Sequence, residues 1–109
     1  MSDYQQIISA IQQVPGVSGA AVIGSNGQVE QSTLPDAAPE MPGVASQIFT
    51  NIGVQTKRMQ RGTLQRLVLE TEEGITLLSG LARGELLVVY AAVVDGFNLA
   101  KLIEVASKY

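Results

Sequence analysis

Apolar residues recur every three or four positions at the start of the chain, which is the spacing of one face of an α-helix. They are Tyr4, Ile7, Ile8, Ile11 and Val14. Ser2 and Gln5 have the spacing of a capping box, in which the two side chains bond the first free amides of a helix. Pro15-Gly16 then stops the pattern, because proline disfavours a helical residue before it. The pattern predicts a first helix over residues 3–13.

Beyond this stop the residues are small or β-branched, which is typical of strands. Residues 17–24 form one such run, and Ser25-Asn26-Gly27 offers the positive-φ residues of a tight hairpin turn. Residues 28–33 return with polar side chains at most positions and a weak core face. We therefore expect a hairpin whose second strand lies at or near an edge of a sheet.

A proline-rich stretch over residues 34–42 predicts a loop, and Pro42 suits the first turn of a helix, where its missing N–H costs nothing. The helix that follows should run to about Gln60 and be the longest in the chain. Gly53 inside it costs up to about 1 kcal/mol relative to alanine, which suggests a close contact of that helix; the alternative is a glycine that the helix simply tolerates. Its apolar stripe comprises Val44, Ala45, Ile48, Phe49, Ile52, Thr56 and Met59.

Three strands in a meander follow, separated by turns at Glu73-Gly74 and Arg83-Gly84. Residues 65–72 alternate, with Leu67, Leu69 and Thr71 facing a core and the remainder, Val68 among them, facing water. Residues 75–82 and 85–94 are more continuously apolar, and the second of these runs reads as a central strand covered on both faces.

Asn98 suits the N-cap position of a last amphipathic helix, whose apolar face comprises Leu99, Leu102, Ile103 and Ala106. The element order is then αββαβββα. Strands joined by hairpins, with helices between the groups, predict an α+β fold with a five-stranded antiparallel sheet flanked by helices. The chain length suits a single domain over residues 1–109.

The composition removes the common enzyme chemistries. The chain has no Cys and no His, so we expect no thiol catalysis, no zinc site of the usual kind and no Ser-His triad. No G-x-x-x-x-G-K-[ST] motif is present to hold a nucleotide, and Ser25 and Ser79 have no base beside them. Glu70, Glu72 and Glu73 are better read as a solvent face than as a metal site. We expect no catalytic residues and no cofactor.

The overall charge, the N-terminal sequence and the lengths of the apolar runs indicate which partners and which cellular location to expect. A formal charge of −3 argues against binding to nucleic acid, which needs clustered cations. The N-terminus lacks a signal peptide, and no apolar run reaches the roughly 20 residues that cross a membrane. A cytoplasmic protein that does not insert into a membrane is the expectation.

Four cations gather at the end of the long helix and the start of the next strand: Lys57, Arg58, Arg61 and Arg66. Cations at a helix C-terminus stabilise it by about 0.3–1 kcal/mol, which is a sufficient structural explanation. The alternative is a contact for an acidic surface of a partner, because the guanidinium fork binds carboxylates well. The sequence leaves both explanations open.

The residues from Ile11 to Ile23, which read IQQVPGVSGAAVI, and the Asn26-Gly27 turn resemble the roadblock/dynein light chain family, as does the element order over nearly the whole chain. The resemblance implies a profilin-like layered fold and a homodimer in which the long helices pack together and the third strands pair. An unpaired edge strand invites such pairing. The expected dimer interface comprises Ala45, Ile48, Phe49, Ile52, Thr56, Met59, Leu67, Val68, Leu69 and Glu70.

The resemblance also implies a non-enzymatic interaction module that regulates or scaffolds a small Ras-like GTPase. One alternative, also found in the family, is a structural light chain or assembly subunit of a motor or filament complex. Another is a small-ligand sensory domain of profilin-like topology, which the scarcity of aromatic and ionisable core residues disfavours.

Overall fold

The computed structural model describes residues 3–35 and 37–109. Ser2, the first residue of the expected capping box, lies outside them. The elements are α1 (Asp3–Gln12), β1 (Val17–Ile23), β2 (Val29–Ser32), α2 (Met41–Arg58), β3 (Arg66–Thr71), β4 (Gly74–Gly80), β5 (Leu86–Ala91) and α3 (Leu99–Ala106). The five strands form one sheet in the order β2-β1-β5-β4-β3, with every neighbouring pair antiparallel. The predicted element order and fold class are confirmed.

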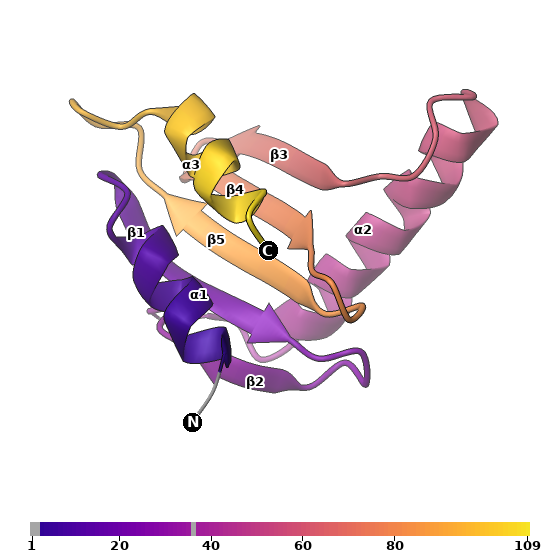
Figure 1. Cartoon of the computed structure of the whole chain (residues 1–109), viewed down its shortest axis with the longest axis horizontal. Helices are drawn as coiled ribbons and strands as arrows, with labels where there is room; N and C mark the ends of the chain where they lie inside the picture. The colour runs from indigo at the N-terminus through magenta and orange to yellow at the C-terminus, as the bar shows by residue number, and fades with distance from the viewer. Residues whose placement is uncertain (1–2, 36) are drawn as a thin grey trace.

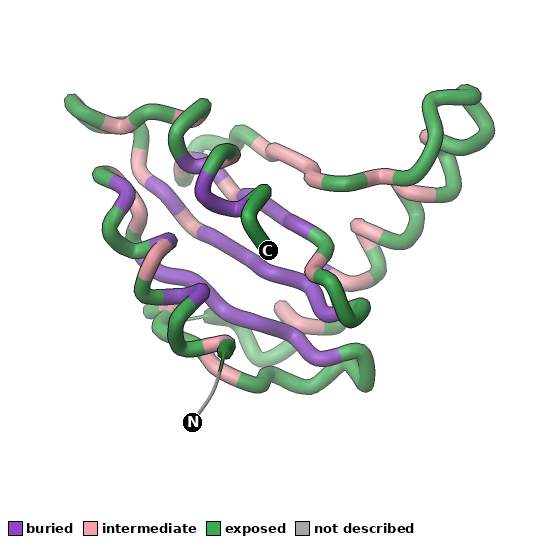
Figure 2. The backbone as a smooth tube through the Cα atoms, viewed as in Figure 1, coloured by how far each residue is buried: buried purple, intermediate pink, exposed green. Residues whose placement is uncertain are grey.

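Helices lie on both faces of the sheet (Figure 1). On one face α1 and α3 lie side by side and share a core with β1, β4 and β5 that includes Ile11, Leu77, Leu87 and Leu102. Figure 2 shows the buried positions running along the three central strands and the inner sides of these two helices. β5 lies at the centre of the sheet and is covered on both faces, as its continuous apolar run predicts.

On the other face α2 packs alone. A smaller cluster joins Ile23, Leu78, Leu86 and Val88 of the sheet to Ala45, and Ile48 and Phe49 pack against it partly buried. Ala45 is the one buried residue of this helix. The two faces are therefore unequally covered, because two helices seal one and part of a single helix seals the other.

The predicted turns contain glycines with a positive φ, two of which are Gly27 and Gly16. In the β1–β2 turn the backbone of Gly27 adopts φ +85°, while the Asn26 side chain accepts a hydrogen bond from the Gln28 N–H at 3.1 Å. Gly27 alone of the three predicted turn residues takes a positive φ. After α1, Gly16 adopts φ +94° and a Cβ there would meet Phe97 at 2.8 Å, so the α1–β1 turn and the segment before α3 pack closely.

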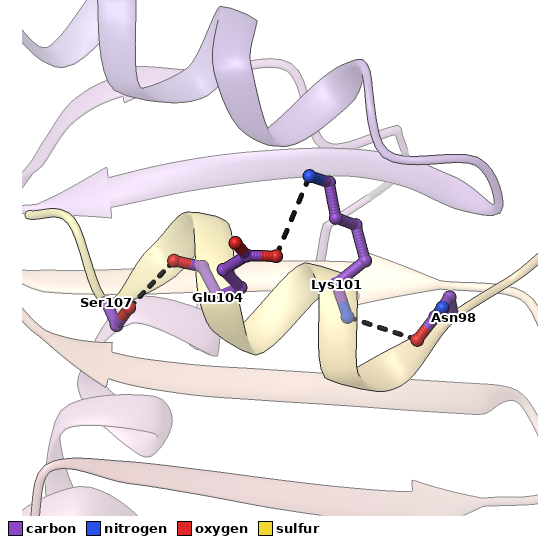
Figure 3. A network of polar contacts seen from close by, with 4 residues as sticks. All are labelled: Asn98, Lys101, Glu104 and Ser107. Atoms are coloured by element: carbon purple, nitrogen blue, oxygen red, sulfur yellow. Dashed lines mark hydrogen bonds and ion pairs between the residues drawn. The ribbon is translucent and has the colours of Figure 1, made fainter.

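The last helix begins where the sequence predicts. The Asn98 side chain accepts a hydrogen bond from the Lys101 N–H at 3.1 Å, and Ser107 closes the other end by donating to the Glu104 carbonyl at 2.7 Å (Figure 3). Lys101 and Glu104 form an exposed ion pair at 3.6 Å. Across the described residues, no helix is both long and apolar enough to traverse a bilayer.

Candidate dimer and partner interface

The apolar stripe of α2 continues beyond the part of the sheet that covers it. Successive residues of a helix are about 100° apart around its axis, so Ala45, Ile52 and Met59 lie on one side. Their exposed fractions rise along the helix from 6% to 36% to 69%. The C-terminal end of α2 and the loop into β3 stand clear of the sheet (Figure 1). The second half of the helix therefore leaves Ile52 partly exposed and Met59 largely exposed, on the side that its first half turns towards the sheet.

The opposite side of α2 has a different character. Gln47 and Val54 lie there by the same helical geometry, and Val54 is 51% exposed. Lys57 and Arg58 in the last turn lie on the same outer half and are exposed. We call this side the outer face of α2. It is defined by Gln47, Val54, Lys57 and Arg58, and it combines one exposed apolar side chain with two cations.

β3 is an edge of the sheet, and all its first four residues are half-buried. Leu67 packs against the core on the α2 side, whereas Val68 packs against the core under α1 and α3. The expectation that Val68 lies on a wet face is therefore not met, because two helices cover that face of the sheet. The opposite edge, β2, is shorter and mostly exposed.

A narrow groove separates the first half of α2 from the sheet. It has a volume of about 180 Å³. Its lining is nearly all apolar and comprises Met41, Val44, Ala45, Ile48, Leu69, Thr76, Leu78, Val88 and Tyr90. The groove thus joins the α2 stripe to the α2-side face of β3.

The structure places the ten expected interface residues on these two elements. Ala45, Ile48, Phe49, Ile52, Thr56 and Met59 belong to α2 or its C-cap, and Leu67, Val68, Leu69 and Glu70 belong to β3. Thr56 has an internal role, since its hydroxyl lies 3.0 Å from the Gly53 carbonyl oxygen and 3.1 Å from that of Gly62. It ties the loop after α2 back to the helix.

Gly53 has no close neighbour that would require a glycine. A Cβ built there lies 3.8 Å from the Leu64 side chain, which is ordinary contact. The close helix contact that the sequence suggests is therefore absent within the described part of the chain.

The four cations of the predicted cluster are brought to one end of the molecule. Lys57 and Arg58 end α2, Arg61 lies in the following loop and Arg66 begins β3. Arg58 reaches the Gln55 side chain at 3.5 Å. Among residues 3–35 and 37–109 the cluster takes part in no ion pair, which leaves its charge available to an acidic surface.

The sequence did not predict a part-buried polar contact between Glu85 and Tyr4. Glu85, 7% exposed, accepts hydrogen bonds from the Tyr4 hydroxyl at 2.8 Å and from the Arg83 N–H at 3.0 Å. They lie at an open groove of about 540 Å³ between α1, the β4–β5 turn and Tyr109. Glu85 was not found because it stands at the end of an apolar run, and only the fold brings Tyr4 to it.

Hydrogen bonding tunes both groups. Burial raises the pKa of the Glu85 carboxyl, but the bonds from Tyr4 and the backbone outweigh burial and bring this pKa below its usual value. The same hydrogen bond, followed by burial, raises the pKa of Tyr4 above its usual value. The pair ties α1 to the β4–β5 turn. Ser79 is a separate case, since its buried hydroxyl has no partner in the described structure.

The described residues contain no cluster of three acidic, histidine or cysteine side chains that could hold a metal ion. The structure is thus a small α+β domain in which the β3 edge and the second half of α2 are partly exposed. A family model described as the Roadblock/LC7 domain matches residues 3–91. The chain belongs to the Roadblock/LC7 domain family.

Solved structures share the fold. A Roadblock/LC7 domain from Streptomyces avermitilis has a TM-score of 0.80 and 23% identity, covering 98% of this chain and 91% of that one. The gliding protein MglB from Thermus thermophilus has a TM-score of 0.71 and 16% identity, with 100% and 94% covered. A structure of MglB with a tetrameric arrangement has a TM-score of 0.71 and 16% identity, with 99% and 93% covered. No curated protein sequence matched the chain.

Proposed function

We propose that residues 1–109 act as one non-enzymatic, cytoplasmic domain that forms a two-fold homodimer through α2 and β3. The exposed second half of the α2 stripe carries this proposal. Ile52 and Met59 continue a core face into solvent, and exposing such a face is unfavourable unless a partner covers it. The free β3 edge beside it supplies unpaired backbone groups for a second copy. The tetrameric arrangement of MglB, a protein with the same fold, agrees with self-association.

The partner of this dimer, we propose, is a small Ras-like GTPase, which the module regulates or scaffolds. Membership of the Roadblock/LC7 domain family supports this role. The outer face of α2 is the docking surface, because it remains free when the stripe on the other side of the helix is buried. Arg58 and Lys57 there suit acidic side chains on the partner.

The dimer is tested by light scattering coupled to size-exclusion chromatography at micromolar concentration. The wild-type chain should elute as a dimer, and Ile52→Asp should convert it to a folded monomer because two carboxylates would be buried at the interface. Gln47→Asp is the matched control, since it places the same charge on the opposite side of the same helix. A wild-type monomer, or a dimer unaffected by Ile52→Asp, would contradict the proposal.

The GTPase role is tested with Ras-like GTPases of the same organism, each loaded with GDP or with a non-hydrolysable GTP analogue. One of them should be retained by the wild-type dimer in one nucleotide state only. The double variant Val54→Asp/Arg58→Glu should lose this retention while staying dimeric. Retention of a filament or motor component without nucleotide dependence would instead favour the structural light-chain role.

A further inference from the structure

The free edge of β3 determines which residues can bond a neighbouring strand. The Gly80 N–H bonds the Gln65 carbonyl at 3.1 Å, and β3 pairs with β4 in continuous register beyond that point. Residues of an antiparallel strand alternate in the direction of their backbone groups. The N–H and C=O groups of Arg66, Val68 and Glu70 therefore point away from β4, towards the free edge.

Arg66 and Glu70 lack charged partners of their own. Neither takes part in an ion pair within the described residues. They stand four residues apart on one face of the strand, which separates their Cα atoms by about 13 Å, so they cannot pair within one chain. Between them lies Val68, half-buried against the α1 and α3 side. A cation, an apolar residue and an anion thus follow one another along the same side of the edge.

A two-fold axis restricts how two such strands can pair. Opposed residues in an antiparallel pair alternate between hydrogen-bonded and non-bonded pairs. A two-fold axis exchanges the two strands, so it must map hydrogen-bonded pairs onto hydrogen-bonded pairs and non-bonded pairs onto non-bonded pairs. This is possible only when the axis passes through a pair in which one residue faces its own copy. The two registers with the greatest overlap of β3 are centred on Val68 and on Leu69.

These two registers differ sharply in side-chain chemistry. Centred on Val68, the pairing sets Arg66 against Glu70 of the partner subunit, twice by symmetry, and sets Leu67 against Leu69 of the partner subunit on the α2 face. Centred on Leu69, it sets Val68 against Glu70 of the partner subunit, and the only acid opposite Arg66 is Glu72 of the partner subunit, which lies in the turn beyond the end of β3. Opposite charges directly across a sheet are favourable, whereas a charge against an apolar residue gains nothing.

We infer that β3 pairs with β3 of a second copy in the register centred on Val68, locked by two symmetric Arg66–Glu70 ion pairs. This inference rests on the proposed dimer and adds its register. Arg66 then belongs to the dimer interface rather than to the surface for an acidic partner. Lys57, Arg58 and Arg61 remain available for that partner.

Charge reversal tests the ion pairs. Arg66→Glu and Glu70→Arg should each raise the dimer dissociation constant about tenfold or more, since two attractions become two repulsions. The double variant should restore it. An equimolar mixture of the two single variants should form heterodimers, because each then faces the opposite charge at both positions. Thermal melts establish that every variant is folded.

Cysteine crosslinking tests the register independently. The chain has no native cysteine, and a residue that faces its own copy is close enough for a bond. Oxidised Val68→Cys should give a covalent dimer and Leu69→Cys should not. The reverse result, or a double charge reversal that restores nothing, would overturn the register while leaving the dimer standing. A monomeric wild-type chain would overturn the proposed dimer itself.

Discussion

Tyr4 and Glu85 show, at the scale of single residues, how a polar contact joins segments 81 positions apart. The contact is charge-assisted, since a hydroxyl donates to a carboxylate. Because the folded pKa of Glu85 is below its usual value, its stabilisation is complete above that usual value and is lost as pH falls through the folded pKa. Tyr4 has the opposite sign, so its contribution is present below its usual pKa and is lost as pH rises through the folded one.

Tyr4→Phe should therefore lower Tm at pH 7, and the difference from wild type should shrink as the pH falls through the lowered folded pKa of Glu85 and its carboxyl becomes protonated. Thermal melts of both chains over a descending pH series measure this. Tyr109→Phe is the control, because Tyr109 lines the same groove without bonding Glu85 among the hydrogen bonds of the described chain. An equal loss for Tyr4→Phe throughout the pH series would show that the charge of Glu85 is irrelevant to the contact.

At the scale of elements, α3 depends on Asn98, the N-cap residue that precedes it. It has eight residues, and so short a helix is marginal without capping and tertiary packing. The Asn98 cap bonds an N–H that would otherwise have no partner (Figure 3).

Asn98→Ala should lower the free energy of unfolding by about 1 kcal/mol, the usual loss for an N-cap. Lys101→Ala keeps the capped N–H and removes only the ion pair with Glu104, whose side chains are 53% and 63% exposed. That variant should change stability by less than about 0.5 kcal/mol. Denaturant titrations compare the two, and equal losses would show that the Asn98 cap contributes no more to stability than the exposed ion pair does.

At the scale of the whole molecule, the charge distribution is lopsided. Residues 57–66 carry four cations and no acid, while the rest of the chain carries three cations and ten acids, giving +4 against −7. The basic end is also the end at which the α2 stripe is exposed. The exposed apolar residues of α2 and the basic cluster thus lie at the same end of the molecule.

Because dimerisation stabilises the folded chain by mass action, Tm should rise with protein concentration. For a dimer of this size the shift is about 3 °C for each tenfold increase. Calorimetry over two decades of concentration measures it. The Ile52→Asp variant should show no such dependence, and a concentration-independent wild type would argue for a stable monomer.

The sequence by itself determined the elements and their order. The 3.6-residue stripe of α2, the turn glycines and the Asn98 cap act locally, so helix and strand bounds followed to within a few residues. The fold class followed as well, because hairpins and a continuously apolar strand leave few ways to build a layered sheet. The absence of Cys and His likewise limited the chemistry without any structure.

Only the tertiary structure decided which of these residues are covered. Ile52 and Met59 belong to the apolar stripe of α2 by their spacing, which does not say whether the chain's own sheet covers them; they are 36% and 69% exposed, because α2 runs past the sheet (Figure 1). Val68 reads as wet, yet two helices cover its face. Glu85 reads as a strand end until Tyr4 of α1 lies beside it. Periodicity reports which side of an element a residue is on, but burial depends on what packs against that side, which is a property of the whole fold.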